Sequence, residues 1–157
     1  IESNLLYSKK DASEKDIESA LSISQSTEFV SKKPEGIHSE ISQGGTNVSG
    51  GQRQRLSIAR AIVRKPEIYI FDDSFSALDF KTDAKLREAL AASCKETKST
   101  VLLVAQRISS ILHADQIIVL DEGKMVGKGT HAELMESCDV YQQIASSQLT
   151  KEELANV

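Results

Sequence analysis

The sequence predicts an α/β protein with a mostly parallel sheet, and two observations carry this prediction. Residues 68–71 and 100–104 are short apolar runs, which are typical of strands buried on both faces of a sheet. Longer segments with apolar residues at helical spacing lie between and beyond these runs. Strands that alternate with helices favour a parallel sheet covered by helices.

The composition is that of an ordinary globular domain. A chain of 157 residues is long enough for one domain with a core, and its residues are 39% hydrophobic and 27% charged. The net charge of -4 argues against a general nucleic-acid or anionic-membrane binder. No apolar run approaches the roughly 18 residues that span a bilayer. Because the chain does not begin with Met, we expect it to be a piece of a longer protein.

Residues 1–33 are polar and carry one clear helical signal. Ser13 can begin a helix. The apolar face of that helix is expected to consist of Ile17, Ala20 and Leu21. A short helix over 27–31 would bury Phe29 and Val30, and the sequence from Pro34 through 37–46 is expected to form a turn and then a loop.

The next helix begins in a way that suits an anion. Ser49 is placed as its N-cap and Gln52 follows three residues later, which predicts a capping box. Gly50 and Gly51 carry no side chain, so a ligand can approach the backbone closely. The first N–H groups of a helix are unpaired and lie at the positive end of its dipole, which favours phosphate. This helix should end before Pro66. Its inward face is expected to hold Leu56, Ala59 and Val63.

Strands and helices alternate through the rest of the chain. The expected strands run over 68–71, 100–104, 116–120 and 124–126, with a turn at Glu122-Gly123 before the last. The expected helices run over 80–95, 109–112, 130–135 and a final segment around 140–145. The residues expected to face inward from the first and last of these helices are Leu86, Leu90, Ala91, Val140, Tyr141, Ile144 and Ala145.

The strand at 68–71 ends in two carboxylates, Asp72 and Asp73. Ligands of open α/β sheets bind at the carboxyl ends of the strands. A carboxylate at this edge suits Mg²⁺, usually through water, although a single Asp at such a place more often only caps a turn. The residues around Asp72 favour the metal, because the anion-binding helix precedes it and the segment 76–79 follows it.

Five motifs, in order, resemble those of ATP-binding cassette (ABC) ATPases. The motifs are Val48-Ser49-Gly50-Gly51-Gln52 (signature), 68–72 (Walker B), Ser76-Ala77-Leu78-Asp79 (D-loop), Gln106 (the switch position) and 116–123 with 129–134 (the exporter-type end). The resemblance covers nearly the whole chain, and an ordered set is far more specific than one motif. It implies part of a P-loop NTPase-like ABC ATPase domain. Residues 1–65 would form the helical signature subdomain, 66–148 the C-terminal part of the parallel-sheet core and 149–157 a polar tail.

The resemblance also implies roles for these residues. Asp73 and Gln106 would stand at the catalytic positions, and Asp72 would hold Mg²⁺ through water. Ser49 and the signature residues after it, which are Gly50, Gly51 and Gln52, would contact ATP held by a second nucleotide-binding domain. Hydrolysis would drive export through a transmembrane domain of the same transporter, on the cytoplasmic side of the cell membrane. No nucleic acid is expected as a partner, and the substrate stays open because the membrane domain selects it.

One part of the family pattern is absent from the sequence. A phosphate-binding loop of the form G-x-x-x-x-G-K-[ST] does not occur, since none of the eight glycines begins one. The family places that loop, the adenine-stacking aromatic and the Q-loop upstream of this stretch. We therefore expect the chain by itself to be inactive and to lack useful affinity for ATP.

Two positions depart from the family pattern. Asp73 stands where the family has a catalytic Glu, and its side chain is one methylene shorter; a misplacement of that order can cost about a hundredfold in rate. Gln106 replaces the switch His, and an amide can donate to a phosphate oxygen but cannot titrate. With the signature intact, this pattern resembles the degenerate-site half of a heterodimeric exporter. The alternatives are a regulatory clamp that binds nucleotide without hydrolysing it and, less favoured, a soluble ABC ATPase acting on DNA or ribosomes.

Other candidate motifs favour structural roles. Gly127-x-Gly129-x-x-Ala132 imitates a dinucleotide fingerprint but lies too near the end of the sequence, so a tight turn is preferred. The three histidines, His38, His113 and His131, and the two cysteines, Cys94 and Cys138, lack the spacing of metal ligands. Arg53 and Arg55 are expected on a solvated face, where they could add attraction for the partner's triphosphate.

Overall fold

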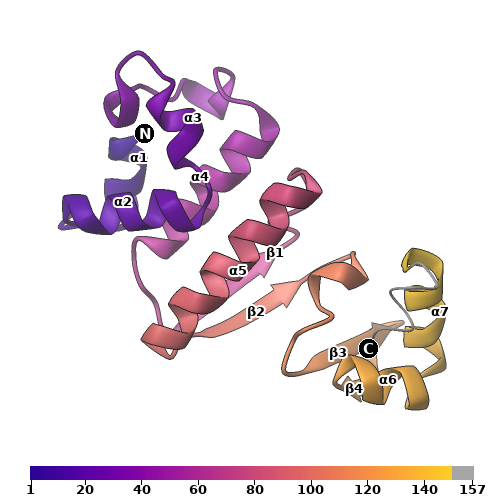
Figure 1. The fold of residues 1–157 in the computed structure, drawn as a ribbon. Helices are drawn as coiled ribbons and strands as arrows, with labels where there is room; N and C mark the ends of the chain where they lie inside the picture. The colour runs from indigo at the N-terminus through magenta and orange to yellow at the C-terminus, as the bar shows by residue number, and fades with distance from the viewer. Residues whose placement is uncertain (150–157) are drawn as a thin grey trace. The chain divides into compact units, whose positions relative to one another are not determined.

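The computed structural model describes residues 1–149 and divides into two units (Figure 1). The first unit runs from Ile1 to Leu102 and the second begins at Leu103. The predicted boundary between 1–65 and 66–148 stays a prediction. Most of the predicted polar tail, from Thr150 on, lies outside the described residues. No described helix is long and apolar enough to cross a bilayer.

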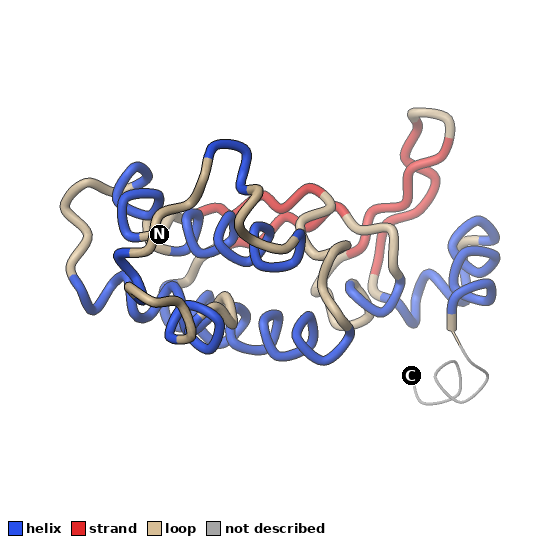
Figure 2. Tube along the Cα trace, turned by 90° about the horizontal axis from the view of Figure 1, so that it is seen from above, coloured by secondary structure: helices blue, strands red, loops and turns tan. Residues whose placement is uncertain are grey.

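Helices dominate the first unit (Figure 2). Before the first strand they are α1 (Glu2–Ser8), α2 (Glu14–Ile23), α3 (Thr27–Ser31), the 3₁₀ turns η1 (Gly36–His38) and η2 (Gln43–Gly45), and α4 (Gly50–Ile62). α2 begins with a capping box between Ser13 and Asp16, which satisfies two backbone N–H groups that the helix leaves unpaired. The predicted inward faces of α2, α3 and α4 are confirmed, since their apolar residues are buried.

The helix α1 has no counterpart among the predicted elements. It is seven residues long, has no side-chain cap and buries one residue, Leu5, so neither capping chemistry nor periodicity marks it in the sequence. Its stability comes from packing against α4, together with Ile1, which is 2% exposed.

A strand–helix–strand unit follows, made of β1 (Ile68–Asp72), α5 (Phe80–Thr97) and β2 (Thr100–Val104), with β1 paired to β2. The prediction that β1 is buried on both faces is wrong. Tyr69 and Phe71 are buried, whereas Ile68 and Ile70 on the other face are 61% and 69% exposed. Strand side chains alternate between faces, so these values show that only one face is covered. The prediction for Ala91 is also wrong: Ala91 is exposed, and Cys94 is buried on the inward face of α5.

The second unit is a hairpin packed on two helices. It contains η3 (Ile108–Ser110), β3 (Ile117–Asp121), β4 (Lys124–Gly129), α6 (His131–Ser137) and α7 (Asp139–Gln148). Glu122 and Gly123 both have positive φ, as the two-residue turn of a hairpin requires. β3 and β4 pair antiparallel, and the described strands form two two-stranded sheets, β1 with β2 and β3 with β4. The residues that fill the core are Ile108, Ile117, Val119, Leu134, Cys138, Tyr141, Ala145 and Leu149. Ile144, expected inward, is 37% exposed.

Candidate functional site

The start of α4 has the predicted capping box. The Ser49 hydroxyl accepts a hydrogen bond from the Gln52 amide at 3.2 Å, and the Gln52 side-chain oxygen accepts one from the Ser49 amide at 3.1 Å. Both residues are therefore held by the helix itself. Among residues 1–149, no acceptor pairs with the amide groups of Gly50 or Gly51. The helix thus presents two free N–H groups at its positive end.

The two signature glycines differ in their surroundings. A Cβ added at Gly50 would meet nothing within 4 Å, so this backbone is open to a ligand. A Cβ added at Gly51 would lie 3.0 Å from the carbonyl oxygen of Ala77, a backbone atom. A side chain at Gly51 would therefore crowd this carbonyl, so glycine favours the packing within the chain, a reason that the sequence did not reveal.

The two carboxylates lie where β1 ends, and both are exposed. Asp73 has a φ of 45°, a left-handed conformation that Asp tolerates better than most residues. This turn reverses the chain directly after the strand. The Ser74 hydroxyl donates to the Asp72 carbonyl at 3.2 Å, and the Ser76 hydroxyl donates to the Asp73 carbonyl at 3.1 Å. These bonds use backbone oxygens, so the Asp72 carboxylate is left for other partners.

The four D-loop residues divide between surface and core. Ser76 and Ala77 are exposed, whereas Leu78 is 5% exposed and anchors the loop. Asp79 is the N-cap of α5 and accepts a hydrogen bond from the Thr82 amide at 3.0 Å. Hydrogen bonds from Thr82 lower the pKa of the Asp79 carboxyl. Asp79 therefore has a structural task besides any role toward a nucleotide.

Gln54 joins the signature helix to this loop, a role that sequence reasoning missed. Its side-chain amide donates to the Asp73 carbonyl at 3.2 Å, and its side-chain oxygen accepts from the Ala77 amide at 2.9 Å. Gln54 lies between two arginines on a polar helix, so no local pattern distinguishes it. The role of Gln54 can therefore be seen only in the tertiary structure.

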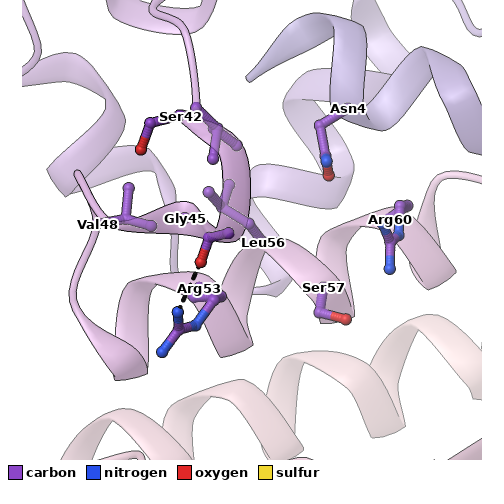
Figure 3. Close-up of a pocket in the computed structure, with 10 residues that line it drawn as sticks. Asn4, Ser42, Gly45, Val48, Arg53, Leu56, Ser57 and Arg60 are labelled. Atoms are coloured by element: carbon purple, nitrogen blue, oxygen red, sulfur yellow. Dashed lines mark hydrogen bonds between the residues drawn. The ribbon is translucent and has the colours of Figure 1, made fainter.

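The predicted solvated face of Arg53 and Arg55 is only partly found. Arg53 donates to the Gly44 carbonyl at 2.9 Å and lines a surface cleft of about 380 Å³ together with Ser57 and Arg60 of the same helix (Figure 3). Arg55 is partly buried, donates to the Gln25 carbonyl and stacks over the Phe29 ring at 4.8 Å. Both guanidinium groups are therefore tied to this chain.

The remaining candidates belong to the second unit or have structural roles. Gln106 belongs to the second unit, where its carbonyl accepts from the Gln148 side chain at 2.9 Å. His131 is 3% exposed and lies 2.7 Å from the Tyr141 hydroxyl, so it is a core residue. His38 pairs with Glu2 at 2.9 Å. Among residues 1–149, no group of three or more His, Cys, Asp or Glu side chains could hold a metal ion. Asp72 can thus offer Mg²⁺ one carboxylate, which fits an ion that keeps water and takes phosphate ligands.

Known proteins match this chain along nearly its whole length. The family model "ABC transporter" matches residues 2–76. An uncharacterised ABC transporter ATP-binding protein of Mycobacterium bovis is 47% identical over 135 residues, which is 86% of this chain and 22% of that protein. A Rickettsia felis protein, provisionally named an export ATP-binding/permease protein, is 39% identical over 150 residues, which is 96% of this chain and 26% of that protein.

A solved structure gives the same result for the fold. The structure of a bacterial Atm1-family ABC exporter with ATP bound superposes with a TM-score of 0.89 at 30% identity, covering 96% of this chain and 26% of that one. The chain thus spans about a quarter of the length of the proteins it matches. It therefore belongs to the ABC transporter ATP-binding proteins and has the fold of part of their ATPase domain.

Proposed function

We propose that this chain is the signature and Walker B part of an ATPase domain that drives an ABC exporter. The observation that carries the proposal is the start of α4, where the free amides of Gly50 and Gly51 stand beside an open backbone. In the complete protein these amides and the Ser49 hydroxyl contact the γ-phosphate of ATP bound to a second nucleotide-binding domain. Backbone donors at a helix N-terminus stabilise the negative charge of a transferring phosphoryl group.

The chain's own nucleotide site is proposed to be degenerate. The Asp73 carboxylate falls short of the place that a glutamate would reach, so it is a poor base for the attacking water. Gln106, as an amide, would hold a phosphate oxygen by a hydrogen bond without carrying charge. Asp72 is the residue that would hold Mg²⁺ through water, and that ion supplies neutralisation of phosphate charge when bound. The domain therefore binds ATP mainly to close a dimer.

The proposed partners follow from the degenerate site, because a transporter needs one site that hydrolyses ATP. A second nucleotide-binding domain with its own catalytic glutamate and histidine would make a heterodimer with one competent site. The relative named as an export ATP-binding/permease protein supports attachment to a transmembrane domain, which would hold this domain at the cytoplasmic face of the membrane. We further propose that the 157 residues alone neither bind nor hydrolyse ATP. Isothermal titration with Mg-ATP tests this, and micromolar affinity would refute it.

ATP hydrolysis by the complete transporter tests the proposal through two residues. Gly51→Asp should nearly abolish hydrolysis and Asp73→Asn should change it little. Because Gly51 also packs on Ala77, Gly50→Asp is the cleaner variant: an Asp at this position favours the helix dipole but repels the phosphate. Gly50→Ala is the matched control and should lose less activity.

The reverse ranking would refute the proposal that the partner's site is competent and this chain's own site is degenerate. If Asp73→Asn abolished hydrolysis while Gly50→Asp did not, the chain's own site would be the active one. If the wild-type pair bound ATP without hydrolysing it, the regulatory clamp would be the correct function.

A further inference from the structure

We propose that Gln54 is a positioning residue that links the signature end of α4 to the loop carrying Asp73. Through it, a phosphate on the partner's nucleotide would be sensed at this chain's own carboxylate. The inference rests on the function proposed above. It goes beyond that function because it couples the partner's nucleotide site to the nucleotide site of this chain.

The first support is the pair of bonds that the Gln54 amide makes. One end donates to the Asp73 carbonyl and the other accepts from the Ala77 amide, at 3.2 and 2.9 Å. Only a side chain with both a donor and an acceptor can satisfy the two backbone groups together. The Ser76 hydroxyl shares the Asp73 carbonyl, at 3.1 Å, so the turn is pinned at both ends.

The second support is the close approach of Gly51 to the same loop. Gly51 and Gln54 are three residues apart on α4 and therefore share a face. The backbone of Gly51 lies so near the Ala77 carbonyl that even a Cβ would stand 3.0 Å from it. A movement of the first turn of α4 must therefore move Ala77 or break the contact, because packed surfaces do not deform freely.

The third support is the shape of the loop itself. The Asp73 carbonyl accepts hydrogen bonds from Gln54 and Ser76, and Leu78 is buried, so the segment between Asp73 and Leu78 is held at both ends. A shift at Ala77 is then passed to Asp73 through Gln54. The direction of the Asp73 carboxylate depends on whether the signature is occupied.

Hydrogen exchange of backbone amides tests the bond in the 157-residue chain. Gln54→Leu should speed exchange of the Ala77 amide by about three- to tenfold, the usual effect of losing one hydrogen bond. Gln54→Glu keeps an acceptor and should restore protection of Ala77. Gln142→Leu, which removes a comparable bond to the Met135 carbonyl at 2.8 Å, is the matched control and should leave Ala77 unchanged. Equal exchange in wild type and Gln54→Leu would overturn the inference.

The link itself is tested in the complete transporter with a non-hydrolysable ATP analogue. In wild type, exchange should slow in the peptides covering 49–56 and 73–79. In Gln54→Leu the first peptide should slow as in wild type, whereas the slowing of the second should be clearly smaller, a difference that mere loss of stability would not produce. ATP bound in this chain's own site protects 73–79 in both proteins, so the two extents of slowing are compared. If 73–79 slowed as much in Gln54→Leu as in wild type, the link would be wrong although the proposed function stood. If 49–56 failed to respond in wild type, the proposed function would fail, and the link would fail with it.

Discussion

At the scale of single residues, this chain uses its signature motif for its own packing as well as for a ligand. Ser49 and Gln52 cap α4, and Gly51 admits the Ala77 carbonyl. Only Gly50 is free of contacts that a side chain would disturb. Substitutions at these neighbouring glycines therefore separate a packing role from a ligand role.

Alanine at the two glycines should give opposite effects on stability. Gly51→Ala forces a methyl group against a backbone oxygen and should lower the free energy of unfolding by about 1–3 kcal/mol. Gly50→Ala meets open space and removes backbone freedom from the unfolded chain, so stability should stay equal or rise by up to about 1 kcal/mol. Urea unfolding of both variants gives the comparison. Equal losses would mean that Gly51 does not approach Ala77 so closely.

At the scale of elements, side chains from distant positions fix how the helices meet. Arg55 of α4 stacks on Phe29 of α3 and donates to the Gln25 carbonyl. His131 of α6 meets Tyr141 of α7 in the core of the second unit. Glycine does the same for β4: a Cβ at Gly127 would lie 2.8 Å from the Cys138 sulfur. Gly127 and Gly129 both lie in β4, so the predicted tight turn is wrong and close packing against the helices explains the pattern.

Replacing Arg55 should weaken the packing of α4 against α3. Arg55→Met keeps much of the apolar stem but loses the stacking and the hydrogen bond, so we expect a loss of about 1–3 kcal/mol in the free energy of unfolding. Thermal or urea unfolding measures it. Arg64→Met, at an exposed position just after the end of α4, is the control and should change stability by less than about 0.5 kcal/mol. Similar losses in both variants would contradict the structural role of Arg55.

The buried histidine should make stability depend on pH. Burial, followed by the nearby His113, lowers the pKa of His131 in the folded chain. In the unfolded chain the same side chain has an ordinary pKa of about 6.5. At pH values between its folded and unfolded pKa, the unfolded chain therefore binds more protons than the folded chain. The free energy of unfolding should therefore decrease as the pH falls below about 6.5. Urea unfolding between about pH 5 and 8 should show this dependence, and His131→Leu should flatten it. Since burial is the main cause, Tyr141→Phe should keep the slope; its disappearance there would assign the effect to the hydroxyl.

At the scale of the whole molecule, the described chain leaves apolar surface uncovered. Ile68 and Ile70 project from β1 with 61% and 69% exposure, and Leu120 and Met125 of the hairpin are 68% and 61% exposed. The relatives are about four times longer than this chain, and we propose that such additional chain covers these faces in the complete protein. Large uncovered apolar surfaces favour association.

The isolated chain should therefore self-associate with increasing concentration. Sedimentation velocity measures this, and Ile70→Thr should reduce association with little loss of stability because the side chain is already exposed. Tyr69→Thr is the matched control on the buried face: it should destabilise the fold without reducing association. A wild-type chain that stays monomeric at all concentrations would contradict the prediction.

Much of the secondary structure was predictable because its causes are local. Capping boxes at Ser49 and Thr130, the stop before Pro66 and the spacing of apolar residues act within a few positions of each other. The ordered motifs likewise identified the family, since each is a short continuous stretch. The helix α1 escaped prediction because its seven residues have no side-chain cap and bury only Leu5.

The sequence by itself thus determined most of the elements and the family, and it proposed the candidate site residues other than Gln54. Only the tertiary structure decided how they meet: that β1 is covered on one face, that Gly51 rests on Ala77 and that Gln54 ties α4 to the loop at Asp73. The physical reason is separation along the chain. Gln54 and Ala77 are 23 positions apart, so their bond depends on the path of β1 and the turn after it, which no short pattern of residues encodes.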